Sequence, residues 1–549
     1  MTKPLNNSQY KALKIIEICQ ELGVKHAVIS PGLRCAPLIK AASKLNLSIT
    51  SCIDERAAGY FALGLYKANK TKSILICTSG TAVLNYLPAL AEAKKTNTPI
   101  LLITADRPKK LIQNNSNQTT DQTLPLKPFL ENQLTIDLDI DKNKYSEIVQ
   151  FFNKLQSSNG PNQINIHFSE PIDDSEEGIK KNLEDIKLEK KEIDNPTKII
   201  PELLEDLKLS KNPLIIVASG SYTIAEFQIL KDSNIPIMLD ITSNLKGELT
   251  AVENLVPSFD HPEIQKYYSD NPPDLIIKFG QYLISKHFLK LKGSKNLKIY
   301  QEKINNNQEI CIEVNEKKCS LKNNLFKTIK TYKAPEKFNF KNWDTLSNRK
   351  RKIIENSEFT FPFISKNFLD IVKDPKTVIL GNSTIVRTFD YYIPDRKLPK
   401  HSIITNRGVS GIEGFTMMSR GVAKALNKPV IVFNGDISFL HDLNSLHELK
   451  KQNQVVIYFL LNNRCGGIFN SIPIKIDSDY KKYMTTDHDV NFGSILKAFN
   501  LNYKKIESKN SYLDIINNLD KIKETTIIEC FVNDDNNIRL FKELRTLSN

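Results

Sequence analysis

Short apolar segments alternate with helical segments along most of this 549-residue sequence. In the first third of the chain, apolar runs predict strands at 26–30, 49–53, 73–77 and 99–104, and helical apolar spacing predicts helices at 9–21, 36–44, 55–69 and 82–95. Strands that follow one another through helical crossovers pair in parallel, and helices then cover both faces of the sheet. The alternation therefore predicts an α/β fold with doubly wound, mainly parallel sheets.

The same alternation returns twice, and two polar segments separate the three blocks. Strands are predicted at 213–217, 235–239 and 275–279, and again at 377–380, 429–433 and 455–460. The charged segment 173–197 and the proline-containing segment 332–343 are interpreted as linkers. A chain of this length exceeds what one hydrophobic core supports. We therefore expect three consecutive domains, at 1–180, 196–332 and 345–549.

Composition narrows the class of protein. The 76 basic and 62 acidic residues give a net charge of +14, but the basic residues are spread out and no nucleic-acid-binding motif is present, so we expect no nucleic-acid partner. No apolar run approaches the roughly 20 residues that cross a bilayer, so we expect no membrane insertion. Eight scattered cysteines without a Cys-x-x-Cys pair argue against a disulfide framework or a zinc site. Because residues 1–10 are polar and do not resemble a secretion signal, the expected location is cytoplasmic.

Polar and charged residues follow the predicted strands of the first block. The strand ends read Ser-Pro-Gly-Leu-Arg at 30–34, Asp-Glu-Arg at 54–56, Thr-Ser-Gly-Thr at 78–81 and Ala-Asp-Arg-Pro at 105–108. In open parallel sheets, ligands bind outside the carboxyl ends of the strands. These four segments therefore form the expected rim of a ligand site.

The third block contains a pair of strand ends suited to a metal ion. Asn434-Gly435-Asp436 ends one apolar strand, and Asn462-Asn463 ends the next. The intervening length fits one helix, predicted at 442–451, between neighbouring parallel strands, which would place Asp436 and Asn463 at the same sheet edge. A carboxylate and an amide oxygen are hard ligands suited to Mg²⁺, and a glycine lets phosphates approach the backbone. A coincidental pair of strand ends is the alternative.

This pair resembles the diphosphate-anchoring motif of thiamine-diphosphate-dependent enzymes. The resemblance implies Mg²⁺ (or Mn²⁺) held by Asp436, Asn463 and the backbone carbonyl of Cys465. It also implies a set of residues that bind thiamine diphosphate, namely Glu55, Ser383, Ile412, Gly435, Asp436, Ile437 and Asn463. The broad family usually has glycine where this chain has Ile437.

Glu55 matches the acid that this family uses to activate the cofactor. It lies in Asp54-Glu55-Arg56, at a predicted strand-to-helix junction. The resemblance implies that its carboxyl group hydrogen-bonds the aminopyrimidine ring and is the catalytic residue. Helix capping is the alternative, because acidic side chains favour the first turn of a helix.

Further motifs narrow the resemblance to one branch. Residues 30–38, 78–82, 104–108, 117–118, 381–387 and 406–414 are similar, in order, to motifs of the MenD branch, the 2-succinyl-5-enolpyruvyl-6-hydroxy-3-cyclohexene-1-carboxylate synthases. The branch implies a transferase of menaquinone biosynthesis. It decarboxylates 2-oxoglutarate and adds the resulting succinyl-semialdehyde carbanion to isochorismate. The implied substrate-binding residues are Arg34, Arg107, Asn117, Gln118, Lys286, Ser383, Arg387, Arg407, Phe469 and Ile472.

The chemistry of the substrates agrees with this set. Each substrate carries two carboxylates, and arginine forks bind carboxylates through paired, charge-assisted hydrogen bonds. A surface ion pair is the alternative for each arginine alone. The chain departs from the branch at three places. Leu33 replaces a serine, and Arg464-Cys465 replaces Asn-Gly. His287 follows Lys286, where some members of the branch have arginine after the lysine.

The family also implies an assembly, and two other classes of function remain open. Glu55 and Asp436 would come from different subunits, so we expect a homodimer or homotetramer with the active site at the subunit interface. Another thiamine-diphosphate carboligase or 2-oxoacid decarboxylase would turn over pyruvate or a similar acid. A nucleotide-binding or nucleic-acid-binding protein would show salt-sensitive binding to DNA or RNA and no dependence on thiamine diphosphate.

Overall fold

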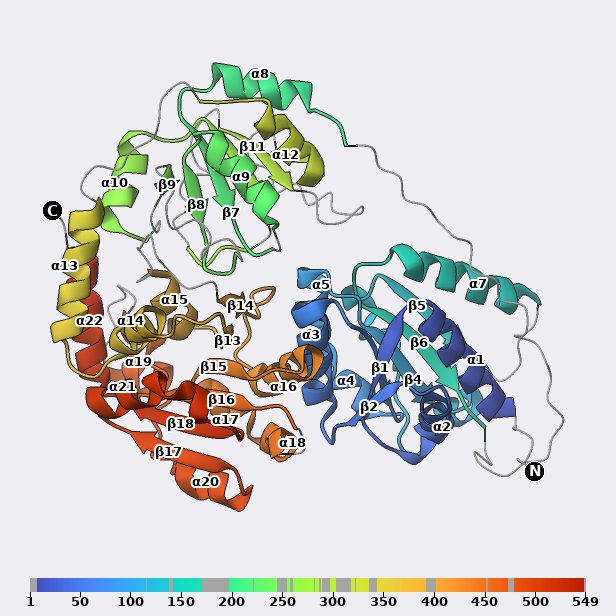
Figure 1. The fold of residues 1–549 in the computed structure, drawn as a ribbon. Coiled ribbons are helices and arrows are strands. Elements are labelled where there is room, and N and C mark those ends of the chain that lie inside the picture. The colour runs from blue at the N-terminus through green and yellow to red at the C-terminus, as the bar shows by residue number, and fades with distance from the viewer. Residues whose placement is uncertain are drawn as a thin grey trace. The chain divides into compact units, whose positions relative to one another are not determined.

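The computed structural model describes residues 7–547 except for short gaps (Figure 1). The residues left out within that range are 115, 138–141, 170–196, 221, 244–253, 257–259, 281, 286–287, 289–296, 303–316, 321, 335–342, 392–400, 451–452 and 472–477. Among the described helices, none is long and apolar enough to cross a membrane.

The first sheet has six parallel strands in the described part of the chain, in the order β2-β1-β3-β4-β6-β5. The strands are β1 (Val24–Ile29), β2 (Ser48–Ser51), β3 (Lys72–Cys77), β4 (Leu101–Asp106), β5 (Asn132–Ile136) and β6 (Asn162–His167). The helices are α1 (Asn7–Glu21), α2 (Ala36–Lys44), α3 (Glu55–Asn69), α4 (Thr81–Leu84), α5 (Leu87–Thr96), α6 (Lys109–Gln113) and α7 (Lys142–Ser157).

Helices cover both faces of this sheet, so its strands are buried on both sides. Apolar residues of α1, α2 and α7 form one core against the sheet, and those of α3 and α5 form another on the opposite face (Figure 1). Parallel strands need this double cover, because their crossover helices lie on the faces of the sheet. The carboxyl ends of the strands remain at one edge, where the polar segments follow.

The middle sheet repeats the architecture, in the order β12-β11-β10-β7-β8-β9. Its strands are β7 (Pro213–Val217), β8 (Ile237–Leu239), β9 (Leu255–Val256), β10 (Leu275–Phe279), β11 (Lys298–Glu302) and β12 (Lys317–Ser320). Its helices are α8 (Pro201–Leu209), α9 (Ile224–Asp232), α10 (Pro262–Asp270) and α12 (Lys322–Lys330).

The third sheet follows the order β14-β13-β15-β16-β18-β17. Its strands are β13 (Thr377–Leu380), β14 (Ser402–Ile404), β15 (Val430–Gly435), β16 (Val456–Asn462), β17 (Asn502–Ile506) and β18 (Thr526–Phe531). The helices of this part are α13 (Trp343–Asn356), α14 (Phe361–Ile371), α15 (Thr384–Tyr391), α16 (Phe415–Leu426), α17 (Asp436–His441), α18 (Leu446–Lys450), α19 (Ser478–Met484), α20 (Phe492–Ala498), α21 (Lys509–Asn517) and α22 (Asp534–Thr546). Three parallel, helix-covered sheets confirm the predicted fold class.

Two predicted helices are wrong in detail. The single helix expected at 82–95 is two helices, α4 and α5, separated at Asn85 and Tyr86. In place of the single helix expected at 442–451, the structure has a 3₁₀ turn at Leu443–Ser445 followed by the short helix α18. A separate helix, α17, precedes them and ends at His441. Asp442 lies between α17 and the turn, and its buried carboxylate accepts backbone N–H groups from Gly414 and Thr416.

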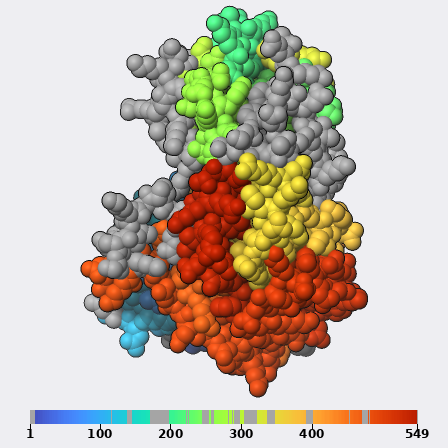
Figure 2. Space-filling model, turned by 90° about the vertical axis from the view of Figure 1, so that its left-hand side faces the viewer, coloured from blue at the N-terminus to red at the C-terminus, as the bar shows by residue number. Residues whose placement is uncertain are grey.

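The chain forms two compact units. The first comprises residues 1–193 with 406–429 and 441–456, and the second comprises residues 194–405 with 430–440 and 457–549. The three-domain boundaries expected from the sequence stay a prediction, and the expected linkers fall mostly outside the described residues. Within the second unit, α13 and α22 pack side by side (Figure 2).

Helices α3 and α16 cross at close range within the first unit. A Cβ atom on Gly64 would lie 2.3 Å from the carbonyl oxygen of Met418, and one on Gly421 would lie 2.2 Å from that of Phe61. Both distances are far below van der Waals contact. Glycine at these two positions therefore allows the helix backbones to approach.

Replacing Gly421 with alanine tests this close approach. Alanine is favoured over glycine in a helix by about 1 kcal/mol, so an uncrowded site would be stabilised. We expect the opposite here, a loss of about 1–3 kcal/mol in the free energy of unfolding measured in urea, because the methyl group meets rigid backbone. The matched control is Gly435→Ala, whose added Cβ would meet nothing within 4 Å. A Gly421→Ala variant as stable as the wild type would contradict the packing.

Candidate functional site

Glu55 lies at the first position of α3, directly after the strand end of β2. Side-chain capping of α3 is performed by Asp54, whose carboxylate accepts the backbone N–H groups of Arg56 and Ala57. The Glu55 Oε2 atom accepts a hydrogen bond from Asn85 Nδ2 at 3.0 Å. The Oε1 atom has no hydrogen-bond partner in the described part of the chain. Glu55 is therefore held in place without being used as a helix cap.

Two of the predicted arginines follow strand ends of the first sheet. Arg34 is 5% exposed, and its Nη1 atom donates to the carbonyl oxygen of Phe168 at 3.1 Å. The Nε atom of Arg107 is buried and has no hydrogen-bond partner among the described residues. A buried, unpaired guanidinium nitrogen is unfavourable unless a ligand satisfies it. Arg107 therefore fits the binding of an anionic group.

The predicted pair Asn117 and Gln118 is exposed and follows α6. Gln118 packs against the loop between β3 and α4. Its carbonyl oxygen accepts from Ser79 Oγ at 3.0 Å, and its Nε2 atom donates to the Ser79 carbonyl oxygen at 3.2 Å. The structure thus brings this pair to the same sheet edge as the Thr-Ser-Gly-Thr segment.

The loop that carries Arg407 is anchored by a buried carboxylate. Glu92 on α5 is 1% exposed, and it accepts the backbone N–H groups of Gly408 at 3.1 Å and Val409 at 2.9 Å. Lys67 Nζ bridges the same carboxylate and the side-chain oxygen of Asn406. These contacts fix the backbone on both sides of Arg407 within the first unit.

Asp442 anchors the other end of this loop, beyond Ile412. Its two carboxylate oxygens accept the backbone N–H of Gly414 at 2.8 Å and that of Thr416 at 3.1 Å. Tyr60 donates its hydroxyl to Glu413 Oε1 at 3.0 Å. Burial raises the pKa of the Asp442 carboxyl to about 6, although the two backbone hydrogen bonds oppose that shift.

In the second unit, the structure brings Asp436 and Asn463 together at neighbouring strand ends. Asp436 follows β15 and Asn463 follows β16, and the Asn463 backbone N–H donates to Asp436 Oδ2 at 3.3 Å. The Ile437 N–H donates to Oδ1 of the same carboxylate at 2.8 Å. His488 Nε2 lies 3.3 Å from Oδ2, and the Val490 N–H donates to His488 Nδ1, so the ring proton faces Asp436.

The residues after Asn463 form a tight loop. Arg464, Gly466 and Gly467 all have positive φ, and the Cys465 carbonyl accepts the Gly467 N–H at 2.8 Å and the Thr486 N–H at 3.4 Å. Left-handed backbone is unfavourable for arginine. Here the Arg464 guanidinium lies 4.9 Å from the ring centre of Phe531, a cation–π contact that helps to hold it. The departure at 464–465 is thus accommodated by left-handed backbone.

The donor set around Asp436 fits a divalent cation. Asp436 is 1% exposed, and in the described part of the chain no lysine or arginine forms an ion pair with it. A buried carboxylate needs compensating charge. Carboxylate, amide and carbonyl oxygens are ligands for Mg²⁺ or Mn²⁺. Open space lies beside Gly435, where a Cβ atom would meet nothing within 4 Å, so phosphate oxygens can approach that backbone.

The thiol of Cys465 does not fit a metal ligand. Its sulfur is a soft ligand, whereas Mg²⁺ and Mn²⁺ prefer oxygen ligands. Among the described residues, no group of three His, Cys, Asp or Glu side chains could hold a metal ion. Only the backbone carbonyl of Cys465 therefore remains a candidate ligand from that residue.

Ser383 and Arg387 lie together after β13, in the second unit. Ser383 has a positive φ of 63°, and its carbonyl oxygen accepts a hydrogen bond from Arg387 Nη1 at 2.6 Å. Phe469 lies on a 3₁₀ turn, and its side chain is 38% exposed. An apolar side chain with this exposure can line a ligand pocket. Leu33 is also exposed. Lys286, His287 and Ile472 lie outside the described residues.

The predicted residues thus divide between the two units. Arg34, Glu55, Arg107, Asn117, Gln118, Arg407 and Ile412 belong to the first unit, and Ser383, Arg387, Gly435, Asp436, Ile437, Asn463, Cys465 and Phe469 belong to the second. Sequence reasoning missed the residues that support them, namely Glu92, Asp442, His488 and Asp534. Asp534 follows a strand end, which is a usable signal, whereas the other three are defined by tertiary contacts.

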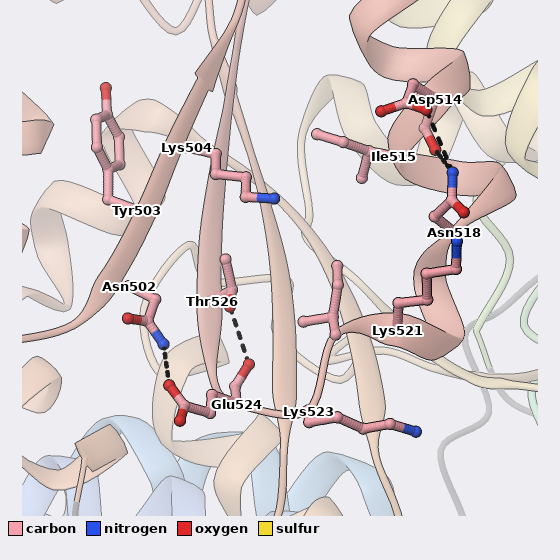
Figure 3. A pocket seen from close by; sticks show the side chains of 11 residues that line it. Asn502, Tyr503, Lys504, Asp514, Ile515, Asn518, Lys521, Lys523, Glu524 and Thr526 are labelled. Atoms are coloured by element: carbon pink, nitrogen blue, oxygen red, sulfur yellow. Dashed lines mark hydrogen bonds between the residues drawn. The ribbon is translucent and has the colours of Figure 1, made fainter.

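A separate pocket lies at the opposite ends of the strands. It has a volume of about 770 Å³ and is lined by residues near the amino ends of β17 and β18, including Asn502, Lys504, Glu524 and Thr526 (Figure 3). Two of these lining residues are hydrogen-bonded, because Asn502 Nδ2 donates to Glu524 Oε2 at 2.7 Å (Figure 3). Ligands of parallel sheets bind at the carboxyl ends. This pocket is therefore distinct from the site around Asp436.

Comparisons with known proteins give the class and then the family. Residues 12–124 match the family model of the thiamine pyrophosphate enzyme N-terminal TPP binding domain, and residues 387–530 match that of the C-terminal TPP binding domain. With three parallel α/β sheets, these matches define an enzyme of the thiamine pyrophosphate class. Thiamine diphosphate is accordingly its cofactor.

Curated relatives match nearly the whole chain. The 2-succinyl-5-enolpyruvyl-6-hydroxy-3-cyclohexene-1-carboxylate synthase of Syntrophus aciditrophicus (strain SB) is 30% identical, over 98% of this chain and 98% of its own. Synthases of the same name match from Flavobacterium johnsoniae, 30% identical over 92% and 93%, and from Christiangramia forsetii, 28% identical over 91% of each chain. The chain belongs to the family of these synthases.

The raised pKa of Asp442 predicts a pH dependence of stability. A carboxyl with a folded-state pKa of about 6 and an ordinary value of 3.8 stabilises the fold fully below pH 3.8, and this contribution is lost as the pH rises through about 6. Relative to Asp442→Asn, the free energy of unfolding of the wild type should fall by up to roughly 3 kcal/mol between pH 4 and pH 7. Urea unfolding of both proteins across this range measures the difference.

The exposed Asp374 provides the control for this comparison. An Asp374→Asn variant should follow the wild type at every pH. A constant difference between the wild type and Asp442→Asn would show that Asp442 has no raised pKa in the folded state.

Proposed function

We propose that this chain is a thiamine-diphosphate-dependent carboligase that decarboxylates 2-oxoglutarate and adds the resulting succinyl-semialdehyde carbanion to isochorismate. The product is 2-succinyl-5-enolpyruvyl-6-hydroxy-3-cyclohexene-1-carboxylate, with release of carbon dioxide, in menaquinone biosynthesis. The observation that carries the choice of reaction is the match to a synthase of that name over 98% of the chain.

Thiamine diphosphate, when bound, supplies the carbanion chemistry, and the protein supplies orientation and proton control. Glu55 is the proposed catalytic residue, whose carboxyl group would hydrogen-bond the aminopyrimidine ring. Its geometry supports this role, because Asn85 fixes one carboxylate oxygen while capping of α3 is left to Asp54. Ile412 and Ser383 are proposed to contact the same cofactor.

The arginines are proposed to bind the carboxylates of the two substrates. The buried, unpaired Nε of Arg107 supports this role, and the anchored loop around Arg407 supports a fixed orientation for a second guanidinium. Bidentate binding of carboxylates orients both substrates at little entropic cost once the arginines are held. The remaining proposed contacts are Arg34, Asn117, Gln118, Lys286, Ser383, Arg387, Phe469 and Ile472.

We also propose Mg²⁺ or Mn²⁺ as the metal, held by Asp436, Asn463 and the Cys465 carbonyl. The buried carboxylate of Asp436, with which no lysine or arginine of the described residues forms an ion pair, supports it. Gly435 and Ile437 are proposed to hold the cofactor's diphosphate next to these ligands. A homodimer or homotetramer, with the active site at the subunit interface, and a cytoplasmic location stay predictions.

The reaction is tested by following the ultraviolet absorbance of isochorismate in the presence of protein, thiamine diphosphate, Mg²⁺ and 2-oxoglutarate. We expect the absorbance to fall only when every component is present. Glu55→Gln should slow turnover by about 10²–10⁴-fold, the usual range for loss of general acid–base catalysis. Glu147→Gln, at an exposed ion pair with Lys144, is the matched control and should leave turnover unchanged.

Each failure points to a different error. If the protein decarboxylates pyruvate or another 2-oxoacid but leaves isochorismate untouched, the class stands and the proposed reaction is wrong. If Glu55→Gln retains full activity, the proposed catalytic role of Glu55 is wrong.

A further inference from the structure

Asp534 lies beside Asn463 because of the register of two neighbouring strands. β16 and β18 run parallel, and Asn462 pairs with Phe531 at their carboxyl ends. The chain continues the pairing for one more step, since the Val532 N–H donates to the Asn462 carbonyl oxygen at 2.9 Å. The residues that follow the two strands therefore lie side by side. Asn463, after β16, donates from its Nδ2 atom to Oδ1 of Asp534, after β18, at 2.7 Å.

This contact decides which way the Asn463 amide faces. An ionised carboxylate can only accept hydrogen bonds, whereas an amide has a donating nitrogen and an accepting oxygen. Asp534 therefore holds the amide nitrogen on its own side and leaves the amide oxygen turned away, available to a cation. Without that acceptor, the amide could rotate and present its NH₂ group, which cannot ligate a metal.

Asp534 also lies against the loop that carries the other candidate ligand, the Cys465 carbonyl. The backbone is tightly confined there, because a Cβ atom on Gly467 would lie 2.7 Å from Asn463 Nδ2 and 2.9 Å from Asp534 Oδ1. One carboxylate thus supports both the Asn463 side chain and the loop that presents the Cys465 carbonyl.

The dipole of helix α22 does not explain the position of Asp534. Acidic residues near a helix amino terminus interact favourably with the helix dipole. The cap of α22, however, is Asn533, whose side chain accepts the Asn536 N–H, and Asp535 shares the first turn. Asp535 is exposed, so it provides the same dipole interaction without the contact to Asn463.

We propose that Asp534 is a positioning residue, which orients the Asn463 amide oxygen and the 463–467 loop toward the divalent cation that anchors the cofactor's diphosphate. This inference rests on the proposed metal site. Residues that orient metal ligands in this way usually contribute 10–100-fold to metal affinity.

The test measures Mn²⁺ affinity from the electron paramagnetic resonance signal of free Mn²⁺, at saturating thiamine diphosphate and without substrate. Asp534→Ala should weaken Mn²⁺ binding by about 10–100-fold. Asp534→Asn keeps an accepting oxygen and should remain within about threefold of the wild type. Asp535→Ala is the matched control on the same helical turn and should not change the affinity.

Thermal unfolding without metal separates positioning from folding. If Asp534→Ala does not fold, Asp534→Leu, which has the shape of Asn but no acceptor, takes its place in the comparison with Asp534→Asn. Equal Mn²⁺ affinity in the wild type and the variant without an acceptor would overturn the inference, as would equal weakening by Asn and by Ala or Leu. If the wild type itself binds no Mn²⁺, the proposed metal site is wrong instead.

Discussion

Parallel pairing of neighbouring strands is the constraint on which the rest of the structure depends. Because β15 and β16 are neighbours in a parallel sheet, the residues that follow them emerge at the same edge. This places the Asn463 backbone N–H against the Asp436 carboxylate at 3.3 Å. β18 is the next strand along, and it delivers Asp534 to the other side of Asn463. Asp436, Asn463 and Asp534, which are distant in sequence, thus lie together at one sheet edge.

Buried carboxylates hold the loops at these edges. Glu92 accepts two backbone N–H groups beside Arg407, and Asp442 accepts two more beyond Ile412. Asp534 fixes an amide in the same manner. A loop backbone bound to a buried acceptor has few alternative conformations, because leaving it would strand a polar group. The predicted ligand-binding side chains are therefore presented by loops that are constrained before any ligand arrives.

The sequence predicted what depends on local pattern and missed what depends on tertiary contacts. The helices Ala36–Lys44 and Glu55–Asn69 and the strands Pro213–Val217, Leu275–Phe279 and Thr377–Leu380 have the predicted bounds, because apolar periodicity and neighbouring turn residues define them locally. Asp436 and Asn463 could be paired from their strand ends. The buried contacts of Asp442 could not be predicted, since its partners are the backbone N–H groups of Gly414 and Thr416 on a separate loop.

β6 shows why polar strands escape such reasoning. Gln163 and Asn165 are buried in this strand, and their side chains form a closed network with Thr104, Asp106 and Gln122. Gln122 also accepts the Gly80 N–H at 2.8 Å, which ties the network to the loop after β3. Alternating polar residues normally indicate an exposed strand face. Here each buried polar group has a partner, and the partners are known only from the fold.

The central claim is that Asp436 and Asn463 hold the cation of a thiamine-diphosphate enzyme. Anomalous X-ray scattering from crystals grown with Mn²⁺ and thiamine diphosphate tests it most directly. The account predicts a manganese peak bonded to the Asp436 carboxylate, the Asn463 amide oxygen and the Cys465 carbonyl, with the cofactor's diphosphate beside it. A peak elsewhere, or a bound cofactor whose diphosphate lies away from Gly435, would contradict the account.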